Sequence, residues 1–185
     1  RLILGLLVHS RVKIKIKGDE SLSKRDFSRV IKPMKMFGQN IKSKTNRLPI
    51  IVKGTNFSRP INYTELKGSA QVKSCILLAA MKTAGKTKIK CVPSRDHTEK
   101  LFSYLNLPIK IKKEKKFETI IFNGKKNYKG FNYIIPGDIS SSSFFIALAL
   151  LSKNSKILIK NVNVNKSRTG IIDILRIMNA KINLQ

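Results

Sequence analysis

Hydrophobic and polar residues alternate along this chain in two different rhythms. At residues 12–17 and 86–90 a lysine stands at every second position, which predicts half-buried strands with one face in water. At residues 72–81 and 144–151 nearly every side chain is apolar, which predicts helices that are buried on most sides. The pattern therefore predicts an α/β fold with its helices inside and its sheets outside, the reverse of a doubly wound sheet.

The same patterns place further elements along the chain. Their alternation favours a fold built from repeated units. Polar connectors are expected at residues 112–116 and 125–130. Helices are predicted at residues 26–37, 70–83, 97–105, 140–151 and 169–178. Strands are predicted at residues 12–17, 48–53, 86–91, 109–113, 117–123, 131–135 and 156–160.

One unit recurs three times: a lysine-rich strand, a polar loop with an arginine, and a helix that ends on Gly or Asn three residues before an isoleucine. The helix ends at Gly38, Asn106 and Asn179 are 68 and 73 residues apart. Repeats of about 70 residues, each with two helices and about four strands, follow from this spacing. The copies span residues 12–41, 87–109 and 157–182.

A sharper break follows the strand predicted at 131–135. Pro136 and Gly137 indicate a chain reversal there, which is either a hinge between domains or a turn from a strand into a helix. We assign residues 1–135 to a first domain and residues 136–185 to the start of a second.

The chain is strongly basic, with 38 Lys and Arg against 10 Asp and Glu and a net charge of +28. Such a charge is typical of proteins that bind nucleic acid. Here the lysines follow the outer faces of the predicted strands and are spread along the whole chain. We therefore expect no nucleic-acid partner, and keep a basic nucleic-acid-binding module as an alternative.

Composition also limits the chemistry. Cys75 and Cys91 are too few for a disulfide framework and, with two histidines, offer no metal-ligand spacing, so we expect reduced thiols, no metal and no cofactor. The longest clean apolar run, residues 144–151, is far shorter than the roughly 20 residues that cross a bilayer. A cytoplasmic protein without a membrane partner is the expectation.

Four polar loops lead into predicted helices, at residues 18–25, 68–73, 94–99 and 165–170. Free backbone N–H groups at a helix start attract anions, and a guanidinium binds phosphate or carboxylate through two parallel hydrogen bonds. Arg25, Arg95 and Arg168 lie in these loops, and Ser69 and Gln71 open an apolar helix. We find no nucleophile with its base and no paired carboxylates, so binding of small anions is predicted.

Three of these loops also have a purely structural interpretation. The loop at residues 18–25 has the character of a solvated turn with an N-cap serine. Ser69 is a natural N-cap, and Asp96 with Glu99 has the spacing of a capping box. Asp138 has the character of a capping carboxylate, and His97 that of a surface residue.

Five motifs in these loops and at the chain reversal resemble, in order and spacing, the bacterial 5-enolpyruvylshikimate-3-phosphate synthase family. The likeness covers the whole chain and is greatest to the branch with Ser-Ala-Gln-x-Lys and Arg-x-His-x-Glu signatures. The motifs are Gly18-Asp19-Glu20-Ser21-Leu22 with Lys24-Arg25, Ser69-Ala70-Gln71-Val72-Lys73, Arg95-Asp96-His97-Thr98-Glu99, Pro136-Gly137-Asp138-Ile139-Ser140-Ser141 and Asn165-Lys166-Ser167-Arg168-Thr169-Gly170.

This resemblance implies a transferase that moves the enolpyruvyl group of phosphoenolpyruvate onto the 5-hydroxyl of shikimate 3-phosphate and releases phosphate. It implies two lobes, each of three inside-out repeats, that close at a hinge in a protein that is a monomer at full length. Phosphoenolpyruvate contacts are assigned to Arg25 and Gln71. Shikimate 3-phosphate contacts are assigned to Ser69, Ala70, Gln71, Ser94 and Arg95.

The match also has departures. Asp26 stands where the family usually has proline, so a carboxylate beside Arg25 is expected to weaken its hold on an anion, and Ser167 replaces a threonine. Arg1 matches the arginine that ends a helix motif of the family, and Asp138 an architectural position at the crossover between lobes.

The family's early Lys-Ser motif and its later acidic proton-transfer residues have no counterpart within residues 1–185. We therefore expect an internal segment that is an incomplete enolpyruvyl transferase-like fold, binds substrate, and has no catalytic residue and no turnover of its own. The alternative within the same class is the related enzyme that acts on a UDP-linked amino sugar.

Overall fold

In the computed structural model, which describes residues 1–124 and 127–184, the chain divides into two units, Arg1–Lys129 and Gly130–Gln185. Of the connector predicted at residues 125–130, Lys125 and Lys126 lie outside the described residues. Within the described ranges, no helix combines the length and the apolar character needed to cross a membrane.

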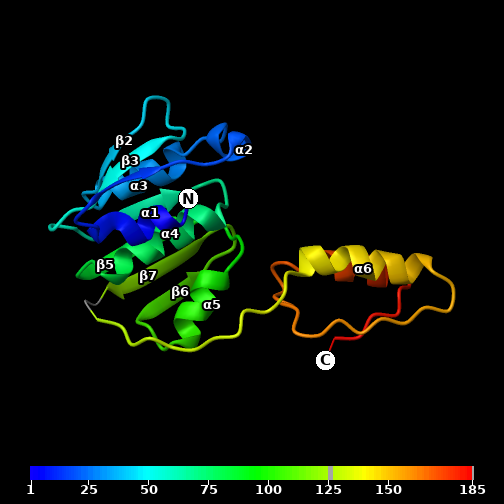
Figure 1. Cartoon of the computed structure of the whole chain (residues 1–185). Coiled ribbons are helices and arrows are strands. Elements are labelled where there is room, and N and C mark those ends of the chain that lie inside the picture. The colour runs from blue at the N-terminus through cyan, green and yellow to red at the C-terminus, as the bar shows by residue number, and fades with distance from the viewer. Residues whose placement is uncertain (125–126, 185) are drawn as a thin grey trace. The chain divides into compact units, whose positions relative to one another are not determined.

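The first unit contains two sheets (Figure 1). One has three antiparallel strands in the order β1 (Lys13–Ile16), β3 (Ile50–Lys53), β2 (Asn40–Lys42). The other has the order β4 (Asn62–Glu65), β5 (Gly85–Cys91), β7 (Glu118–Gly124), β6 (Ile109–Lys113). In this second sheet β4 is parallel to β5, and the remaining pairs are antiparallel.

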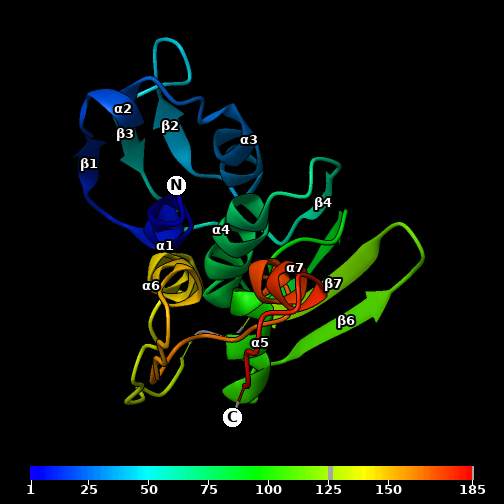
Figure 2. The same ribbon diagram turned by 90° about the vertical axis from the view of Figure 1, so that its right-hand side faces the viewer.

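Helices of the first unit lie largely between these sheets, as Figures 1 and 2 show for α1, α3 and α4. They form the inner layer and the strands form the outer layers. The helices are α1 (Ile3–Leu6), the 3₁₀ turn η1 (Leu7–His9), α2 (Glu20–Ser23), α3 (Ser28–Met36), α4 (Ala70–Met81) and α5 (His97–Tyr104).

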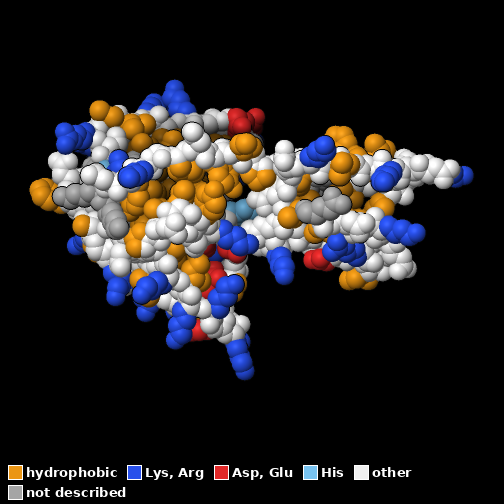
Figure 3. Space-filling model, turned by 90° about the horizontal axis from the view of Figure 1, so that it is seen from below, with side chains coloured by type: hydrophobic (Ala, Val, Ile, Leu, Met, Phe, Trp, Pro, Cys, Tyr) orange, Lys and Arg blue, Asp and Glu red, His pale blue; other side chains and the backbone are white. Residues whose placement is uncertain are grey.

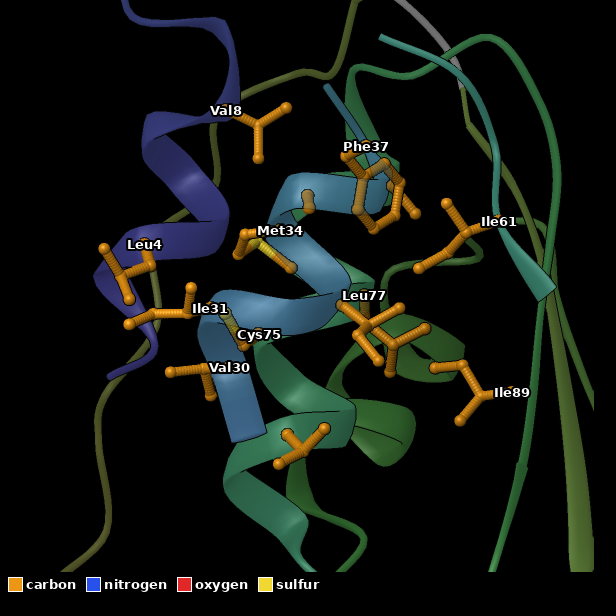
Figure 4. Packing of buried hydrophobic residues seen from close by; sticks show 14 of the residues in the cluster. Leu4, Val8, Val30, Ile31, Met34, Phe37, Ile61, Cys75, Leu77 and Ile89 are labelled. Carbon is orange, nitrogen blue, oxygen red and sulfur yellow. The ribbon is translucent and has the colours of Figure 1, made fainter. Parts of the chain in front are cut away.

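Helix α4 occupies the centre of the hydrophobic core (Figure 4). Cys75, Ile76 and Leu77 are fully buried, as expected for a helix without a polar face. Strand β5 alternates: its lysines are exposed, while Ile89 and Cys91 point into the core. The predicted arrangement, with helices inside and sheets outside, is confirmed for this unit.

The predicted repeat is confirmed in one complete copy and in the helix endings of all three, but the strand of the third copy is absent from the described residues. Residues 62–124 form β4-α4-β5-α5-β6-β7, which is two helices and four strands. In the first sheet β3 lies between β1 and β2, as β7 lies between β5 and β6 in the second sheet. The first sheet therefore repeats the latter part of this order. Gly38, Asn106 and Asn179 all have positive φ. After each, an N–H donates to a carbonyl five residues back, the Schellman ending of a helix.

The second unit contains α6 (Ile139–Leu151) and α7 (Gly170–Ile177). Gly137 forms a parallel bridge with Val162, so segments before and after α6 pair as β4 and β5 do around α4. The strands predicted at 131–135 and 156–160 are absent from the described residues. Those predictions were wrong because a strand needs a neighbouring strand to form hydrogen bonds with, and the local sequence does not show whether one is present.

Helix α6 does not have the burial that its sequence predicted. Phe144, Leu148 and Leu151 are exposed by 78%, 63% and 86%. Within residues 130–184 the structure provides α6 with no sheet to pack against. An apolar helix is buried only where a second layer covers it, so the prediction holds for α4 and fails for α6 in this chain.

Candidate anion-binding site

The candidate site lies where two parallel strands end. Glu65 at the end of β4 is opposite Cys91 at the end of β5. Because parallel strands have the same direction, the loops that follow them leave the same edge of the sheet. Gly68 in the first loop lies beside the second, and a Cβ at this position would be 3.5 Å from the carbonyl oxygen of Pro93.

The loop before α4 is held by a carboxylate. Glu65 accepts hydrogen bonds from the N–H groups of Lys67 (3.1 Å) and Ser69 (2.9 Å), and Gly68 supplies the positive φ that this turn requires. Ser69 is the N-cap residue, but its side chain makes no capping hydrogen bond. The structure therefore does not support capping as the role of the Ser69 hydroxyl, which remains available to a ligand with the first N–H groups of α4.

The loop before α5 contains Ser94 and Arg95. The Ser94 Oγ atom is buried and has no hydrogen-bond partner in the described part of the chain. Arg95 is exposed, and no carboxylate among the described residues pairs with it. Asp96 is ion-paired with Lys100 at 3.3 Å and makes no capping hydrogen bond. This loop thus presents a cation beside an unsatisfied buried hydroxyl.

The capping box predicted from Asp96 and Glu99 is wrong. Glu99 is 2% exposed, and its carboxylate pairs with Lys73 of α4 at 2.6 Å. Lys73 is itself completely buried and also contacts Glu118 of β7 at 2.7 Å. A lysine inside an apolar helix must find such partners, because an unpaired charge is very costly to bury.

Burial and charged neighbours together set the pKa values of Lys73 and Cys91. Desolvation alone lowers the pKa of Lys73, but the hydrogen bond to Glu118 and the close negative charges of Glu99 and Glu118 outweigh it, so the pKa is raised. The Sγ atom of Cys91 is 3.6 Å from the Glu118 carboxylate, and burial raises the pKa of this thiol to about 12. The ammonium therefore stays charged at neutral pH, and the thiol stays protonated.

Arg25 lies in the loop between α2 and α3 and is exposed. The carboxylate of its neighbour Asp26 accepts from the Ser28 hydroxyl (2.5 Å) and the Ser28 N–H (2.8 Å). These two hydrogen bonds lower the pKa of Asp26. The carboxylate that was expected to weaken the anion grip of Arg25 is thus engaged by Ser28, and no ion pair joins Asp26 to Arg25 in the described residues.

Arg1 connects two parts of the site that sequence reasoning did not join. Its Nη1 donates to the Gln71 side-chain oxygen (2.7 Å), and its Nη2 donates to the Asp26 carbonyl (2.8 Å). The guanidinium carbon lies 5.3 Å from the centre of the Phe27 ring. Partial burial and the positive charges of Arg29 and Arg25 lower the pKa of Arg1. Gln71 is thereby held near the Arg25 loop.

In the third copy of the repeat, the corresponding arginine is already paired. Arg168 Nη2 lies 3.0 Å from the Asp138 carboxylate and also donates to the Ser140 hydroxyl. Asp138 caps α6 through the Ser140 N–H, which together with Arg168 lowers the pKa of Asp138. The capping role predicted for Asp138 is confirmed. Arg168 is thus partly satisfied within its own unit, whereas Arg95 has no such carboxylate among the described residues.

The fold and these loops define a repeat-built α/β protein with cationic loops at helix starts. A family model described as EPSP synthase (3-phosphoshikimate 1-carboxyvinyltransferase) matches residues 1–185. The chain belongs to this family, as the resemblance of its motifs implied.

Individual relatives support this assignment to the family. Proteins named 3-phosphoshikimate 1-carboxyvinyltransferase from Petrotoga mobilis and Vesicomyosocius okutanii are 42% and 43% identical over the whole chain. An EPSP synthase structure from Acinetobacter baumannii matches the whole chain with a TM-score of 0.81 and 32% identity. The chain spans 43%, 42% and 41% of these three proteins, respectively. The prediction of an incomplete enolpyruvyl transferase-like fold is confirmed.

Proposed function

We propose that this chain takes part in transferring the enolpyruvyl group of phosphoenolpyruvate to the 5-hydroxyl of shikimate 3-phosphate, with release of phosphate. Relatives that are named 3-phosphoshikimate 1-carboxyvinyltransferase support this reaction. The observation that carries the proposal is the joining of two arginine-bearing loops to the N-terminal turn of α4, by Arg1 on one side and by Lys73 on the other.

Shikimate 3-phosphate carries a phosphate and a carboxylate, and both suit this edge of the sheet. The start of α4 offers N–H groups to an anion, and Arg95 offers a guanidinium. The buried Ser94 Oγ atom has no partner in the described residues, so an acceptor from a ligand would remove an energetic cost. The proposed contacts are Ser69, Ala70, Gln71, Ser94 and Arg95.

Phosphoenolpyruvate is assigned to the neighbouring side of α4. Arg25 would bind one of its anionic groups, and Gln71, whose side chain is held by Arg1, would contact both substrates. The pKa of Arg1 is lowered first by burial and then by the charges of Arg29 and Arg25, so positive charge is concentrated here, which supports this assignment.

We further propose that residues 1–135 form most of the first lobe and residues 136–185 the start of the second, in a cytoplasmic protein that is a monomer at full length. The division of the structure after Lys129 supports a boundary close to the Pro136-Gly137 reversal. Figure 3 shows lysine and arginine side chains scattered over the visible face, a distribution that favours small anions over nucleic acid as ligands.

The test is a titration of the 185-residue chain with shikimate 3-phosphate at modest salt, followed by amide chemical shifts and by calorimetry. Signals from residues 69–71 and 94–95 should move. Arg95→Ala should weaken binding about tenfold or more, because a hydrogen bond to a charged group contributes about 1.5–3 kcal/mol.

Arg168→Ala is the matched control, since this arginine has the same place in its repeat but is paired with Asp138. It should leave the affinity unchanged. Equal losses in both variants would contradict the assignment of Arg95. An absence of shifts in the folded wild-type chain, together with a DNA duplex that perturbs a contiguous lysine surface, would instead favour a nucleic-acid-binding module.

A further inference from the structure

The buried cluster of Lys73, Glu99 and Glu118 lies immediately behind the candidate site. Lys73 is one turn beyond Ser69, and its backbone N–H donates to the Ser69 carbonyl at 3.2 Å. The backbone of Lys73 is therefore hydrogen-bonded to the turn that opens α4, and the side chain starts from this turn.

On the other side of the ion pair is the first turn of α5. Glu99 follows Arg95 by four residues, and the Lys73 Nζ atom lies 2.6 Å from its carboxylate. The hydroxyls of Ser74 and Thr98 are 2.6 Å apart, next to this pair. The N-terminal turns of α4 and α5, which follow the two candidate loops, are thus joined twice.

Glu118 supplies the third contact, from the sheet. It lies opposite Cys91, the last residue of β5, and its carboxylate is 2.7 Å from Lys73. The ammonium is therefore shared between the first turn of α5 and the start of β7, which is paired with the end of β5.

The balance of charge shows which contact depends on Lys73. Both carboxylate oxygens of Glu99 are buried, and neither meets hydrogen-bond geometry with another described residue, so the close ion pair with Lys73 is their compensation. Without it, Glu99 would have to move toward water or be protonated, because an unpaired carboxylate is too costly to bury. Movement of Glu99 would displace the start of α5.

We propose that Lys73 is a positioning residue for substrate binding: through Glu99 it fixes the turn at residues 69–71 relative to the loop at residues 94–95. The proposal rests on the proposed function, because those residues are the assigned contacts of shikimate 3-phosphate. Lys73 itself is fully buried and acts only through the groups that it holds.

A pair of variants separates positioning from general stabilisation. Glu99→Met and Glu118→Met each remove one carboxylate, and each leaves Lys73 with one balanced partner. Only the first removes the ion pair between α4 and α5, and the hydroxyl contact between Ser74 and Thr98 stays in both variants. Affinity for shikimate 3-phosphate is measured by calorimetry on the 185-residue chain, and the stability of each variant by urea unfolding, so that folded proteins are compared.

Glu99→Met is expected to weaken binding by about threefold to thirtyfold, which corresponds to a coupling of about 0.6–2 kcal/mol, within the range of indirect couplings. Glu118→Met should stay within about twofold of wild type. Glu99→Gln keeps an acceptor for the Lys73 ammonium and removes the negative charge. It should recover most of the affinity, which it would not do if Glu99 acted only through its charge.

Two results would overturn the proposal: affinities of Glu99→Met and Glu118→Met that match wild type, or affinities that fall equally. If the wild-type chain itself did not bind, the proposed function would fail. The positioning proposal would then be tested by comparing the amide spectra of wild type and variants without ligand. Glu99→Met should then shift amide signals at residues 69–71 and 94–95, and Glu118→Met should leave residues 69–71 in place; unmoved signals in both contradict it.

Discussion

The charged side chain of Lys73 inside α4 requires negatively charged partners around it. Lys73 has apolar or small neighbours along most of the helix, and its charge is compensated by residues far along the chain. In the sequence, Lys73 is a charged residue within the otherwise nearly apolar stretch 72–81. Its partners were not predictable, because Glu99 had an equally good local interpretation as part of a capping box.

Removing this charge should destabilise the chain strongly. Lys73→Met would leave two buried carboxylates without a cation, and breaking a buried ion pair in this way costs about 3–5 kcal/mol. The free energy of unfolding from urea titration measures the effect. Lys24→Met is the control: its pair with Glu20 is exposed, so its loss should cost less than about 1 kcal/mol.

The difference in the free energy of unfolding between wild type and Lys73→Met should decrease at strongly alkaline pH. The folded-state pKa of Lys73 is raised above its unfolded value of about 10.4, so its stabilisation is complete below that pH. As the pH rises through the folded pKa, the stabilisation is lost, and wild type and Lys73→Met should converge. A gap that stayed constant to strongly alkaline pH would show that the ammonium is not the stabilising group.

Local signals predicted the helix ends well. The endings at Gly38, Asn106 and Asn179 depend on residues within one turn, so the sequence contains all that is needed. The strands expected at 131–135 and 156–160 failed because pairing depends on segments far apart in sequence. Strands β2 and β4 were missed because their sequences, Asn-Ile-Lys and Asn-Tyr-Thr-Glu, are mostly polar and show no clear alternation.

Asn106 tests the helix ending of the complete repeat. It has φ +52° after α5, a conformation that costs a residue with a Cβ about 1–2 kcal/mol unless the side chain is Asn or Gly. Asn106→Ala should therefore lower the free energy of unfolding by about 1 kcal/mol, while Asn106→Gly should be close to neutral. Equal losses in the two variants, measured by thermal or urea unfolding, would point to the lost amide group and not to the backbone.

The copies of the repeat differ in what their arginine contacts. Arg168 is paired with Asp138 beside the start of α6, whereas Glu65, which precedes α4, is turned toward the backbone of its own loop. Arg95 thereby keeps its charge for a ligand. The sequence marked all three arginines alike, because the pairing of Arg168 depends on a residue before the preceding helix.

At the scale of the whole chain, all the proposed binding residues belong to the unit Arg1–Lys129. This unit also contains most of the buried core, from Leu4 to Phe122. A chain shortened to residues 1–129 should therefore fold and bind shikimate 3-phosphate with the affinity of the 185-residue chain. Calorimetry on both, with circular dichroism to establish folding, makes the comparison; a folded but non-binding short chain would assign part of the site to residues 130–185.

Sequence motifs identified the family and the loops of the candidate site, because the motifs are contiguous. The contacts that connect these loops escaped prediction. Arg1 with Gln71, and Lys73 with Glu99, join residues from different elements, and only folding brings them together. The substrate contacts assigned to individual residues remain predictions.

The exposed apolar row of α6 has a consequence for how the chain behaves in concentrated solution. Phe144, Leu148 and Leu151 favour contact between copies, while a net charge of +28 repels them. Salt shortens the reach of that repulsion from about 30 Å at 0.01 M to about 3 Å at 1 M, and leaves apolar attraction in place. The chain should therefore remain dispersed in dilute buffer and cluster as ions are added, so its colloidal stability depends on the lysines that its ligand site does not use.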